Sequence, residues 1–392
     1  MKQITNPRLT EEFFRPELDA SLTPPVVRGN PPLFYHPEVG DYVMSGGMAM
    51  TPGGRIYLAW FSGGDNDKAV ILIAHSDDGG LNFSQPQFIL DPGYASCGIH
   101  ISAVIGNLWT APDGRLFFFF GTSLDYYDGR AGVWFSICEN PDADSPKWSP
   151  SLRICDGAAL NKPTVLNNGK WLLPVSLWDR RYITLGAASS SVYRELDPQR
   201  MANVYESSDQ GRTWTRIGGV KTSAPTHDEH MILERQDGSL LMYLRTLKGR
   251  YEQCFSFDGG HSWSQPKRVS FSSGPSRFFL RRLQSGRTLL VRCHNPKRPI
   301  YRANMTAYLS EDDGKTWPYS LLLDPRGRVS YPDGFQTPDG RIFIQYDRLR
   351  EHGEILMAIF REEDILAGQL VSQGSILRHP VIQTWSAKHN VL

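Results

Sequence analysis

Ser207-Ser208-Asp209-Gln210-Gly211-Arg212-Thr213-Trp214 is a complete copy of the pattern Ser-x-Asp-x-Gly-x-(Thr/Ser)-Trp. It encodes a self-contained hairpin turn, because the Asp carboxylate can accept backbone N–H groups, Gly adopts positive φ and Trp packs the turn against its sheet. Complete copies return at Ser256–Trp263 and Ser310–Trp317. Ser76–Phe83 is a weaker copy, and Ser136–Trp148 is interpreted as a degenerate copy with an insertion. The copies indicate a repeated unit built from strands.

A second series of turns divides the chain into six units. Each turn lies between two apolar runs, such as the run Leu116–Phe120, and centres on a glycine: Gly54, Gly114, Gly169, Gly238, Gly286 and Gly340. Glycine-containing hairpins between β-rich runs are typical of antiparallel sheets. Each unit is long enough for one four-stranded sheet, and repeats built only from strands are typical of propellers. The sequence therefore predicts an all-β, six-bladed propeller of four-stranded antiparallel blades, with residues 1–392 as a single domain and its core at about 40–365.

Composition agrees with a globular β protein. Gly 36, Pro 27 and an aromatic share of 11% favour turns and strands, and one short helical turn is expected near 362–368. Lys+Arg 42 against Asp+Glu 41 leaves a net charge of +1. This balance provides no global basic field for nucleic acid or an anionic membrane, so we predict neither as a partner.

Cofactors and disulfides are not indicated. The five cysteines are scattered without CxxC spacing, which favours buried thiols in a reducing compartment. No metal-ligand spacing and no glycine-rich phosphate loop occur, so we expect no metal and no cofactor. The first residues lack the apolar core of a signal peptide, which predicts a cytoplasmic location for the chain as it stands, although a secreted protein trimmed of its leader would read the same.

Polar residues open the innermost strands of five predicted blades. They are His100, Asn161-Lys162, Asp228-Glu229-His230, Ser276-Arg277 and Tyr331-Pro332-Asp333. Because the innermost strands of a propeller converge on its axis, we expect these residues to face one central ligand pocket. The segments 182–200 and 296–301 are expected to be loops that roof this pocket and set its specificity.

The repeated turns in six blades resemble those of the sialidase superfamily, whose hallmark is the same Asp-box repeat. The resemblance covers about residues 40–365. Because such turns also occur in propellers that are not enzymes, a site has to be argued separately. The resemblance implies a glutamate that opens the fourth blade, here Glu229, paired with Arg245, and a further arginine, here Arg302. Two guanidiniums can grip a planar carboxylate bidentately.

The resemblance also implies the reacting groups. Tyr331 opens the sixth blade, where a sialidase has its tyrosine nucleophile, and Asp67 fits the acid/base position in the first blade, with Asp65 as the rival. A neutral phenol avoids the repulsion that an anionic nucleophile would meet at an anomeric carbon bearing a carboxylate. Glu229 can take the phenol proton.

The first blade departs from the family. Sialidases open it with Arg-Ile-Pro, whereas the corresponding strand, Met44–Met50, carries no arginine. We expect Arg28 or Arg277 to supply the missing guanidinium. His100, Lys162 and His230 complete the predicted substrate-binding set.

The resulting hypothesis is an exo-acting, retaining glycoside hydrolase that releases a terminal sialic acid or a related acidic sugar from a glycan or glycoconjugate. A first alternative is a propeller hydrolase or polysaccharide lyase that uses His100 or His230 as acid or base on a uronic-acid-containing glycan. A second alternative is a non-catalytic glycan-binding propeller. The sugar, the linkage and the oligomeric state stay open.

Overall fold

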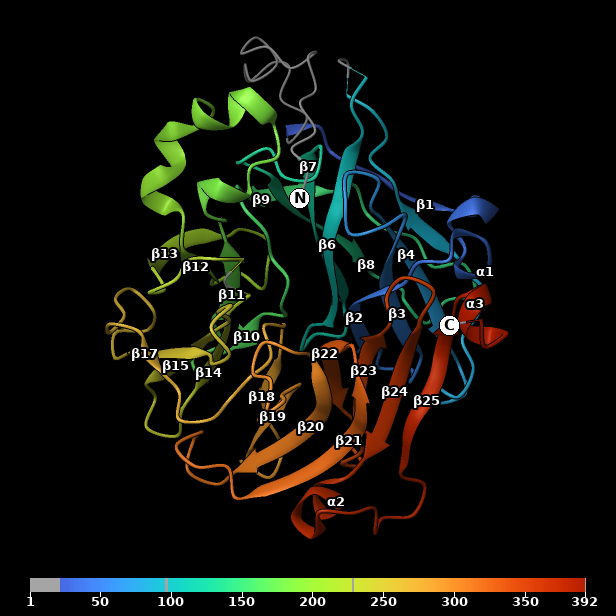
Figure 1. Cartoon of the computed structure of the whole chain (residues 1–392), viewed down its shortest axis with the longest axis vertical. Coiled ribbons are helices and arrows are strands. Elements are labelled where there is room, and N and C mark those ends of the chain that lie inside the picture. Colours follow the sequence, from blue (N-terminus) through green and yellow to red (C-terminus); the bar gives the residue numbers. More distant parts are fainter. Residues whose placement is uncertain (1–21, 96–97, 228, 392) are drawn as a thin grey trace.

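The computed structural model describes residues 22–95, 98–227 and 229–391, in which six antiparallel sheets surround a central axis (Figure 1). The chain forms a six-bladed β-propeller, as the repeats predict. Each sheet uses consecutive strands. Its first strand lies innermost, except in the first sheet, where β2 is innermost and β1 is at the outer edge: β2 packs against β6 and β22, and β14 packs against β10 and β18. That the whole of residues 1–392 forms one domain stays a prediction.

The first three sheets come from residues before 221. The first contains β1 (Val27–Gly29), β2 (Met44–Met50), β3 (Ile56–Ser62), β4 (Val70–Ser76) and β5 (Phe88–Leu90), in the order β1-β5-β4-β3-β2. The second contains β6 (Ile101–Thr110), β7 (Leu116–Leu124), β8 (Gly132–Cys138) and β9 (Leu152–Cys155), and the third contains β10 (Thr164–Val165), β11 (Trp171–Ser176), β12 (Ala202–Ser207) and β13 (Thr215–Val220). The added strand β1 makes the first sheet five-stranded rather than four-stranded.

The last three sheets have four strands each. The fourth contains β14 (Met231–Glu234), β15 (Leu240–Leu244), β16 (Glu252–Ser256) and β17 (Lys267–Arg268). The fifth contains β18 (Phe279–Arg282), β19 (Thr288–Arg292), β20 (Ala303–Ser310) and β21 (Tyr319–Gly327). The sixth contains β22 (Val329–Gln336), β23 (Ile342–Arg348), β24 (Glu354–Phe360) and β25 (Ile376–Gln383).

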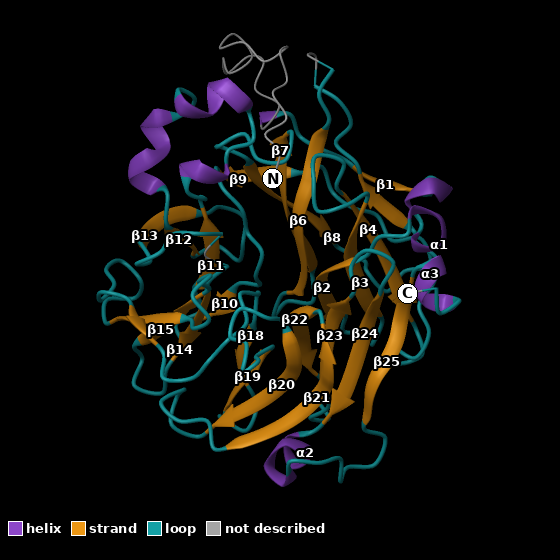
Figure 2. Cartoon of the chain, in the orientation of Figure 1, coloured by secondary structure: helices purple, strands orange, loops and turns teal. Residues whose placement is uncertain are grey.

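Helices are short and lie at the periphery of the strands (Figure 2). They are α1 (Pro37–Gly40), α2 (Glu362–Ala367), α3 (Trp385–Lys388) and the 3-10 turns η4 (Leu33–Tyr35), η5 (Arg180–Tyr182), η6 (Gly186–Ser190) and η7 (Arg194–Gln199). The turn expected near 362–368 is α2. Among the helices of the described ranges, none is long and apolar enough to cross a membrane.

The two series of turns occupy different places in each blade. The six predicted glycines all lie between the innermost strand of a blade and the next strand, with φ between 80° and 92°. In the repeat at Ser207, the Asp209 carboxylate accepts the Thr213 N–H at 2.9 Å and its hydroxyl at 2.6 Å, and the Gly211 N–H donates to the Ser207 hydroxyl at 2.8 Å. The same two backbone N–H bonds recur in the copies at Ser256, Ser310 and Ser76. At Ser136 the hydroxyl instead donates to the Ser149 carbonyl.

The core lies between neighbouring sheets. The strand β7 is buried along its whole length, because Phe117 and Phe119 pack toward the third sheet while Phe118 and Phe120 pack toward the first. Burial on both faces explains its continuous apolar run. Four cysteines are free, buried thiols, namely Cys138, Cys155, Cys254 and Cys293, whereas Cys97 lies outside the described residues.

Polar contacts between the first and sixth blades close the ring. Asp333 on β22 accepts hydrogen bonds from the Met48 N–H at 2.8 Å and from the Lys162 ammonium at 2.6 Å. Lys162 also donates to the carbonyls of Met48 and Gly334. The buried Lys162 therefore joins the third blade to both ends of the ring.

Replacing Asp333 tests this closure. Asp333→Asn leaves the Lys162 ammonium buried without a counter-charge, and we expect the free energy of unfolding to fall by about 3 kcal/mol. Urea unfolding followed by circular dichroism measures the change. The matched control is Glu206→Gln, whose partner Lys170 is 41% exposed and for which we expect a loss below about 1 kcal/mol. Equal losses would contradict this account of ring closure.

Candidate active site

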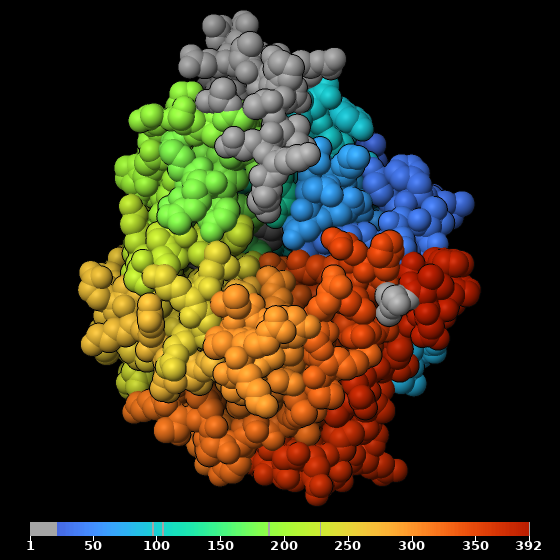
Figure 3. Space-filling model, viewed as in Figure 1, coloured from blue at the N-terminus to red at the C-terminus, as the bar shows by residue number. Residues whose placement is uncertain are grey.

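A cavity of about 530 Å³ opens at the end of the propeller where the innermost strands begin. In the space-filling view, the blue, yellow and orange parts of the chain meet around a central recess (Figure 3). Its walls carry acidic groups (Asp65, Asp67, Asp125, Glu229), guanidiniums (Arg181, Arg245, Arg277, Arg302, Arg350) and aromatic rings (Phe61, Tyr126, Trp178, Tyr182, His227, Tyr331). Residues from all six blades thus meet in one cavity.

Tyr331, Glu229 and Arg245 contact one another by hydrogen bonds and an ion pair. The Tyr331 hydroxyl donates to Glu229 Oε1 at 2.6 Å and accepts from Arg245 Nη1 at 3.3 Å. Arg245 also forms an ion pair with Glu229 Oε1. The side chains of Glu229 and Arg245 are 2% and 5% exposed, so these charges interact with little screening from water.

The backbone holds both ends of this hydrogen bond in an uncommon conformation. Tyr331 has φ 53° and Glu229 has φ 38°, in the left-handed region that non-glycine residues rarely adopt. The β22–β23 register shifts between Ser330 and Asp333, so Tyr331 lies on a bulge that turns its side chain toward the cavity. Such strain is common at functional sites, where the surrounding structure sustains it.

The environment fixes the protonation of the pair. Burial opposes ionisation of Glu229, but the Arg245 guanidinium, His227 and the hydrogen bond from Tyr331 together outweigh burial and hold the pKa of this carboxyl below its ordinary value of 4.5. Burial and the Glu229 carboxylate raise the pKa of Tyr331, although nearby arginines act in the other direction. At neutral pH the group therefore contains a neutral phenol that donates to an ionised carboxylate.

Three further guanidiniums surround the Tyr331 ring. Their carbons lie 4.2 Å (Arg350), 5.2 Å (Arg277) and 5.6 Å (Arg302) from the ring centroid. Arg302 donates to the Pro275 carbonyl, and Arg350 contacts the carboxylates of Asp347 and Asp65. The cavity thus gathers Arg245, Arg302 and Arg350, of which the sequence reasoning missed Arg350.

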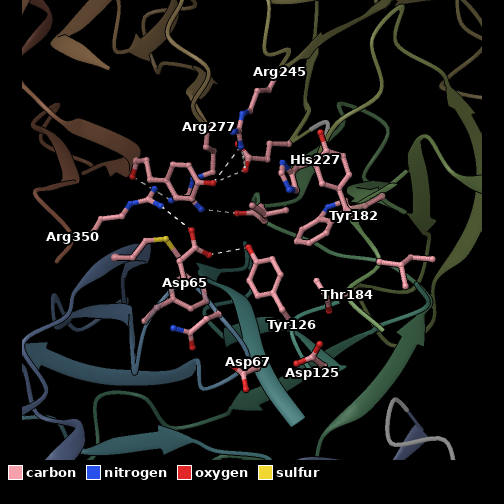
Figure 4. Close-up of a pocket in the computed structure, with 18 of the residues that line it drawn as sticks. Asp65, Asp67, Asp125, Tyr126, Tyr182, Thr184, His227, Arg245, Arg277 and Arg350 are labelled. Carbon is pink, nitrogen blue, oxygen red and sulfur yellow. Dashed lines mark hydrogen bonds and ion pairs between the residues drawn. The ribbon is translucent and has the colours of Figure 1, made fainter. Parts of the chain in front are cut away.

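The two candidate acids differ in orientation. Asp65 points toward the centre of the cavity, where Oδ1 accepts from the Tyr126 hydroxyl at 2.9 Å and Oδ2 lies 3.4 Å from Arg350 Nη1 (Figure 4). Asp67 also lines the cavity but lies beside Asp125, away from Arg350. Burial and then the Asp67 charge raise the pKa of Asp125.

An aromatic wall stands opposite the arginines. The His227 ring lies 4.4 Å from Tyr182 and meets Trp178 edge-on at 4.7 Å, centroid to centroid. Burial and the Arg245 charge lower the pKa of His227 to about 4, so the imidazole is neutral at pH 7. Tyr182, Ile183 and Thr184 reach the cavity from the segment that was expected to roof it.

The two residues predicted to replace the missing arginine lie in different places. Arg28 is on β1, which pairs with β5 at the outer edge of the first sheet, and it is not among the residues that line the cavity. Arg277 does line the cavity, but it donates to the carbonyls of Gly46, Leu160 and Tyr331 beneath the phenol. Asp228 lies outside the described residues.

His100, His230 and Lys162 make their hydrogen bonds to the surrounding protein framework. His100 contacts the Asp67 carbonyl at 2.7 Å and the Asp91 carboxylate at 3.3 Å, so it positions the Asp67 loop. His230 is buried against the Asn203 carbonyl, and burial lowers its pKa to about 4. Lys162 belongs to the ring closure. These three residues are not among those that line the cavity, and the expectation that they bind substrate stays a prediction that this placement does not favour.

The described part of the chain contains no group of three or more His, Cys, Asp or Glu side chains arranged to hold a metal ion. The expected absence of a cofactor stays a prediction. What the cavity provides is a hydrogen-bonded acid–base pair, a cluster of guanidiniums and an aromatic wall.

The fold and the site together define this protein as a β-propeller whose axial cavity is rich in guanidinium groups. The chain belongs to the BNR repeat-like domain family, which it matches over residues 54–344. It is similar to a sialidase of Micromonospora viridifaciens, with 30% identity over 150 residues that cover 36% of this chain and 23% of that protein. It is also similar to an anhydrosialidase of Macrobdella decora, with 25% identity over 273 residues that cover 64% of this chain and 33% of that protein.

The chain therefore spans about a quarter to a third of the length of these curated relatives. Among solved structures, it is similar to the intramolecular trans-sialidase of Ruminococcus gnavus in complex with oseltamivir carboxylate. The TM-score is 0.63 at 15% identity, and the match covers 86% of this chain and 98% of that one. This likeness supports the fold, and the resemblance to the sialidase superfamily is confirmed.

Removing the Arg245 charge tests the electrostatics of the pair. In Arg245→Gln, the strongest opposition to the burial of Glu229 is lost, so we expect the pKa of this carboxyl to rise by about one unit or more. Titration of ¹³C-labelled glutamate by NMR measures it, with the Glu229 signal assigned from Glu229→Gln. Arg302→Gln is the control, because Arg302 does not contact Glu229, and it should leave this pKa unchanged. An unchanged pKa in Arg245→Gln would contradict the assignment.

Proposed function

We propose that this chain is a sialidase-like glycoside hydrolase that releases a terminal acidic sugar, a sialic acid or a related 2-keto acid, from a glycan. The observation that carries the proposal is the 2.6 Å hydrogen bond from the Tyr331 hydroxyl to the Glu229 carboxylate, within a cluster of guanidiniums. This pair is poised to make a phenolate next to cations that attract an anionic substrate.

Arg245, Arg302 and Arg350 would bind the sugar carboxylate. Each lines the cavity and has its guanidinium near the Tyr331 phenol. A carboxylate held there brings the anomeric carbon, to which it is attached, next to the phenol oxygen. Binding and alignment are thus achieved by the same contacts, and such positioning accounts for much of enzymatic rate enhancement.

In the first step, the Tyr331 oxygen attacks the anomeric carbon as its proton moves to Glu229. The bond from that carbon to the leaving-group oxygen breaks, and Asp65 donates a proton to this oxygen. The products are a tyrosyl glycoside and the free alcohol. Asp65 is proposed instead of Asp67 because its carboxylate points to the centre of the cavity and contacts Arg350.

In the second step, the ionised Asp65 takes a proton from water as the water oxygen attacks the anomeric carbon. The bond to Tyr331 breaks, and Glu229 returns the proton to the phenolate. Two displacements at one carbon retain its configuration.

The contacts of the histidines argue against the alternative with a histidine acid or base. His100 and His230 are engaged by backbone and carboxylate partners outside the cavity lining. His227 does line the cavity, but its pKa of about 4 makes it a poor proton donor at neutral pH.

Tyr331→Phe tests the nucleophile. We expect kcat/KM on a 4-methylumbelliferyl sialoside to fall at least about 10³-fold, because no oxygen remains to form the covalent intermediate. The control is Tyr243→Phe, whose buried hydroxyl donates to the Gly314 carbonyl remote from the cavity, and it should keep full activity. Full activity in Tyr331→Phe would exclude the proposed nucleophile. Binding of sialosides by the parent without turnover would support a glycan-binding propeller instead.

Asp65→Asn tests the acid. With a sugar leaving group, we expect a loss of about 10² to 10⁴-fold in kcat/KM, because a poor leaving group needs protonation. With a 4-nitrophenyl leaving group the loss should be much smaller. Asp67→Asn is the matched comparison and should show no such dependence on the leaving group. The reverse pattern would return the role to Asp67. NMR of the product distinguishes a hydrolysed sugar from an anhydro sugar.

A further inference from the structure

Four exposed cations lie on two loops that reach the cavity. The loops are 245–251, between β15 and β16, and 293–302, between β19 and β20, and the end residues Arg245 and Arg302 line the cavity. The second loop includes the segment 296–301, which the sequence predicts as part of a roof. The four cations, here called the basic rim, are Lys248, Arg250, Lys297 and Arg298. None of them lines the cavity, and the function proposed above gives them no role.

The two loops are in direct contact. A Cβ at Gly249 would lie 2.6 Å from the Pro299 Cβ, and Gly249 has φ 71°, so close packing and backbone conformation both favour glycine at this position. The rim cations flank Gly249 in the first loop and directly precede Pro299 in the second. The four cations therefore belong to one surface, although they come from two blades.

The rim cations form no ion pair with a carboxylate among the residues that the structure describes. Residues 245–251, 269–277 and 293–302, at the cavity end of the fourth and fifth blades, contain no Asp and no Glu. Arg250 instead donates to the Ser270 carbonyl at 2.9 Å. Uncompensated like charges on one surface attract an anionic partner.

The opposite side of the cavity mouth has the reverse charge. In the ring of six blades, the first and second blades lie opposite the fourth and fifth (Figure 1). Their equivalent loops, 63–69 and 125–131, contain four aspartates against one lysine and one arginine. An anionic polymer at the mouth would therefore be repelled on that side and attracted to the basic rim.

The surroundings of the rim favour a polysaccharide over a single-stranded nucleic acid. Nucleic acids of that kind stack their bases on free aromatic faces. Here the Arg298 guanidinium lies 4.8 Å from the centroid of the Tyr301 ring, and the Arg292 guanidinium lies 4.5 Å from that of Phe271, so cations already cover both rings. The loop of the rim also ends at Arg302, where the proposed function places the carboxylate of a sugar.

We propose that the basic rim is a docking surface for a polyanionic glycan, that is, a polysaccharide with repeated sulfate or carboxylate groups. Its two arginines can each bind such a group bidentately, while the two lysines act as point charges. The choice of a glycan rests on the proposed function and deepens it. The rim would hold the protein on an anionic polymer while the separate cavity takes a terminal sugar.

Binding to three polysaccharides tests the rim. Heparin carries sulfate and carboxylate groups, polysialic acid carries carboxylates alone, and dextran is neutral. In the Tyr331→Phe background, which prevents cleavage, we expect binding to one or both anionic polymers and none to dextran. The affinity should fall as ionic strength rises from about 0.01 M to about 1 M, because the Debye length drops from about 30 Å to about 3 Å. Adding Lys248→Gln and Lys297→Gln should weaken binding at least about fivefold, because two exposed ionic contacts are lost.

The matched control removes two cations from the other end of the propeller. Arg212 and Lys315 are exposed and lie in the repeated turns between the third and fourth strands of their blades. Arg212→Gln with Lys315→Gln changes the net charge by the same amount and should leave binding unchanged. Equal losses in the two double variants would overturn the rim, because binding would then depend only on total charge.

Other partners are competing outcomes. Tighter binding of double-stranded DNA, or of vesicles that contain phosphatidylserine, lost on removal of Lys248 and Lys297, would overturn the assignment to a glycan. A protein that binds neither heparin nor polysialic acid would overturn it too. Binding to heparin alone would support the rim with sulfate as the recognised group, and binding to polysialic acid alone would support it with carboxylate.

The binding measurements separate this proposal from the proposed function. A parent protein that binds these polymers through the rim but hydrolyses no sialoside would retain the docking surface and overturn the proposed function. Turnover of sialosides by a parent whose polymer binding does not depend on Lys248 and Lys297 would overturn the docking surface and leave the proposed function in place.

Discussion

Closure of the ring between the first and sixth blades is the constraint on which the rest of the molecule depends. Asp333 bonds the backbone of Met48 in the first blade, and Tyr331 lies two residues before Asp333 on the same strand. Asp347 accepts from the Ser45 N–H and also pairs with Arg350. The contacts that close the propeller therefore also fix the phenol and one of its guanidiniums.

This arrangement concentrates positive charge. Arg245, Arg277, Arg302 and Arg350 all lie near one phenol ring, and like charges at such distances repel in a partly buried site. The carboxylate of Glu229 compensates Arg245, while carbonyl groups receive the N–H groups of Arg277. An incoming carboxylate would reduce the remaining repulsion, so the same charges would favour the binding of an anion, as the proposed function requires.

The architecture and part of the site could be predicted from the sequence because they depend on local patterns. Glycine turns such as Gly54 and Gly114 mark the hairpins of each blade, and polar residues before apolar strands mark Glu229 and Tyr331. The sequence patterns did not identify Arg350 and Tyr126, because these residues follow the second strand of their sheets, whereas the patterns pointed to residues that open the first strand. In an antiparallel hairpin, the end of the second strand lies beside the start of the first, so both positions face the axial cavity.

The sequence could not predict which way each polar side chain at a strand end points. His100 and Lys162 stand at the same kind of position as Glu229, yet each finds partners within the scaffold. Neither strand periodicity nor spacing reports which of several polar groups at a strand end will be satisfied by backbone carbonyls. The position of Arg28 could not be predicted either, because its short strand β1 pairs with β5 and therefore lies at the outer edge of the first sheet.

The source of the third guanidinium follows from ring geometry. The innermost strand of the first blade, which carries no arginine, has Gly46 and Gly47 in its middle, and a Cβ at Gly47 would lie 2.2 Å from the Asn107 side chain. Arg277 reaches across the axis to the Gly46 carbonyl, so this part of the floor is already filled. Because the sixth blade adjoins the first in the closed ring, Arg350 can approach the phenol from that neighbouring blade. In the site proposed above, Arg350 of the sixth blade would therefore take the role that the resemblance gives to an arginine of the first blade, since the axis, and not the position in the chain, decides which side chains meet.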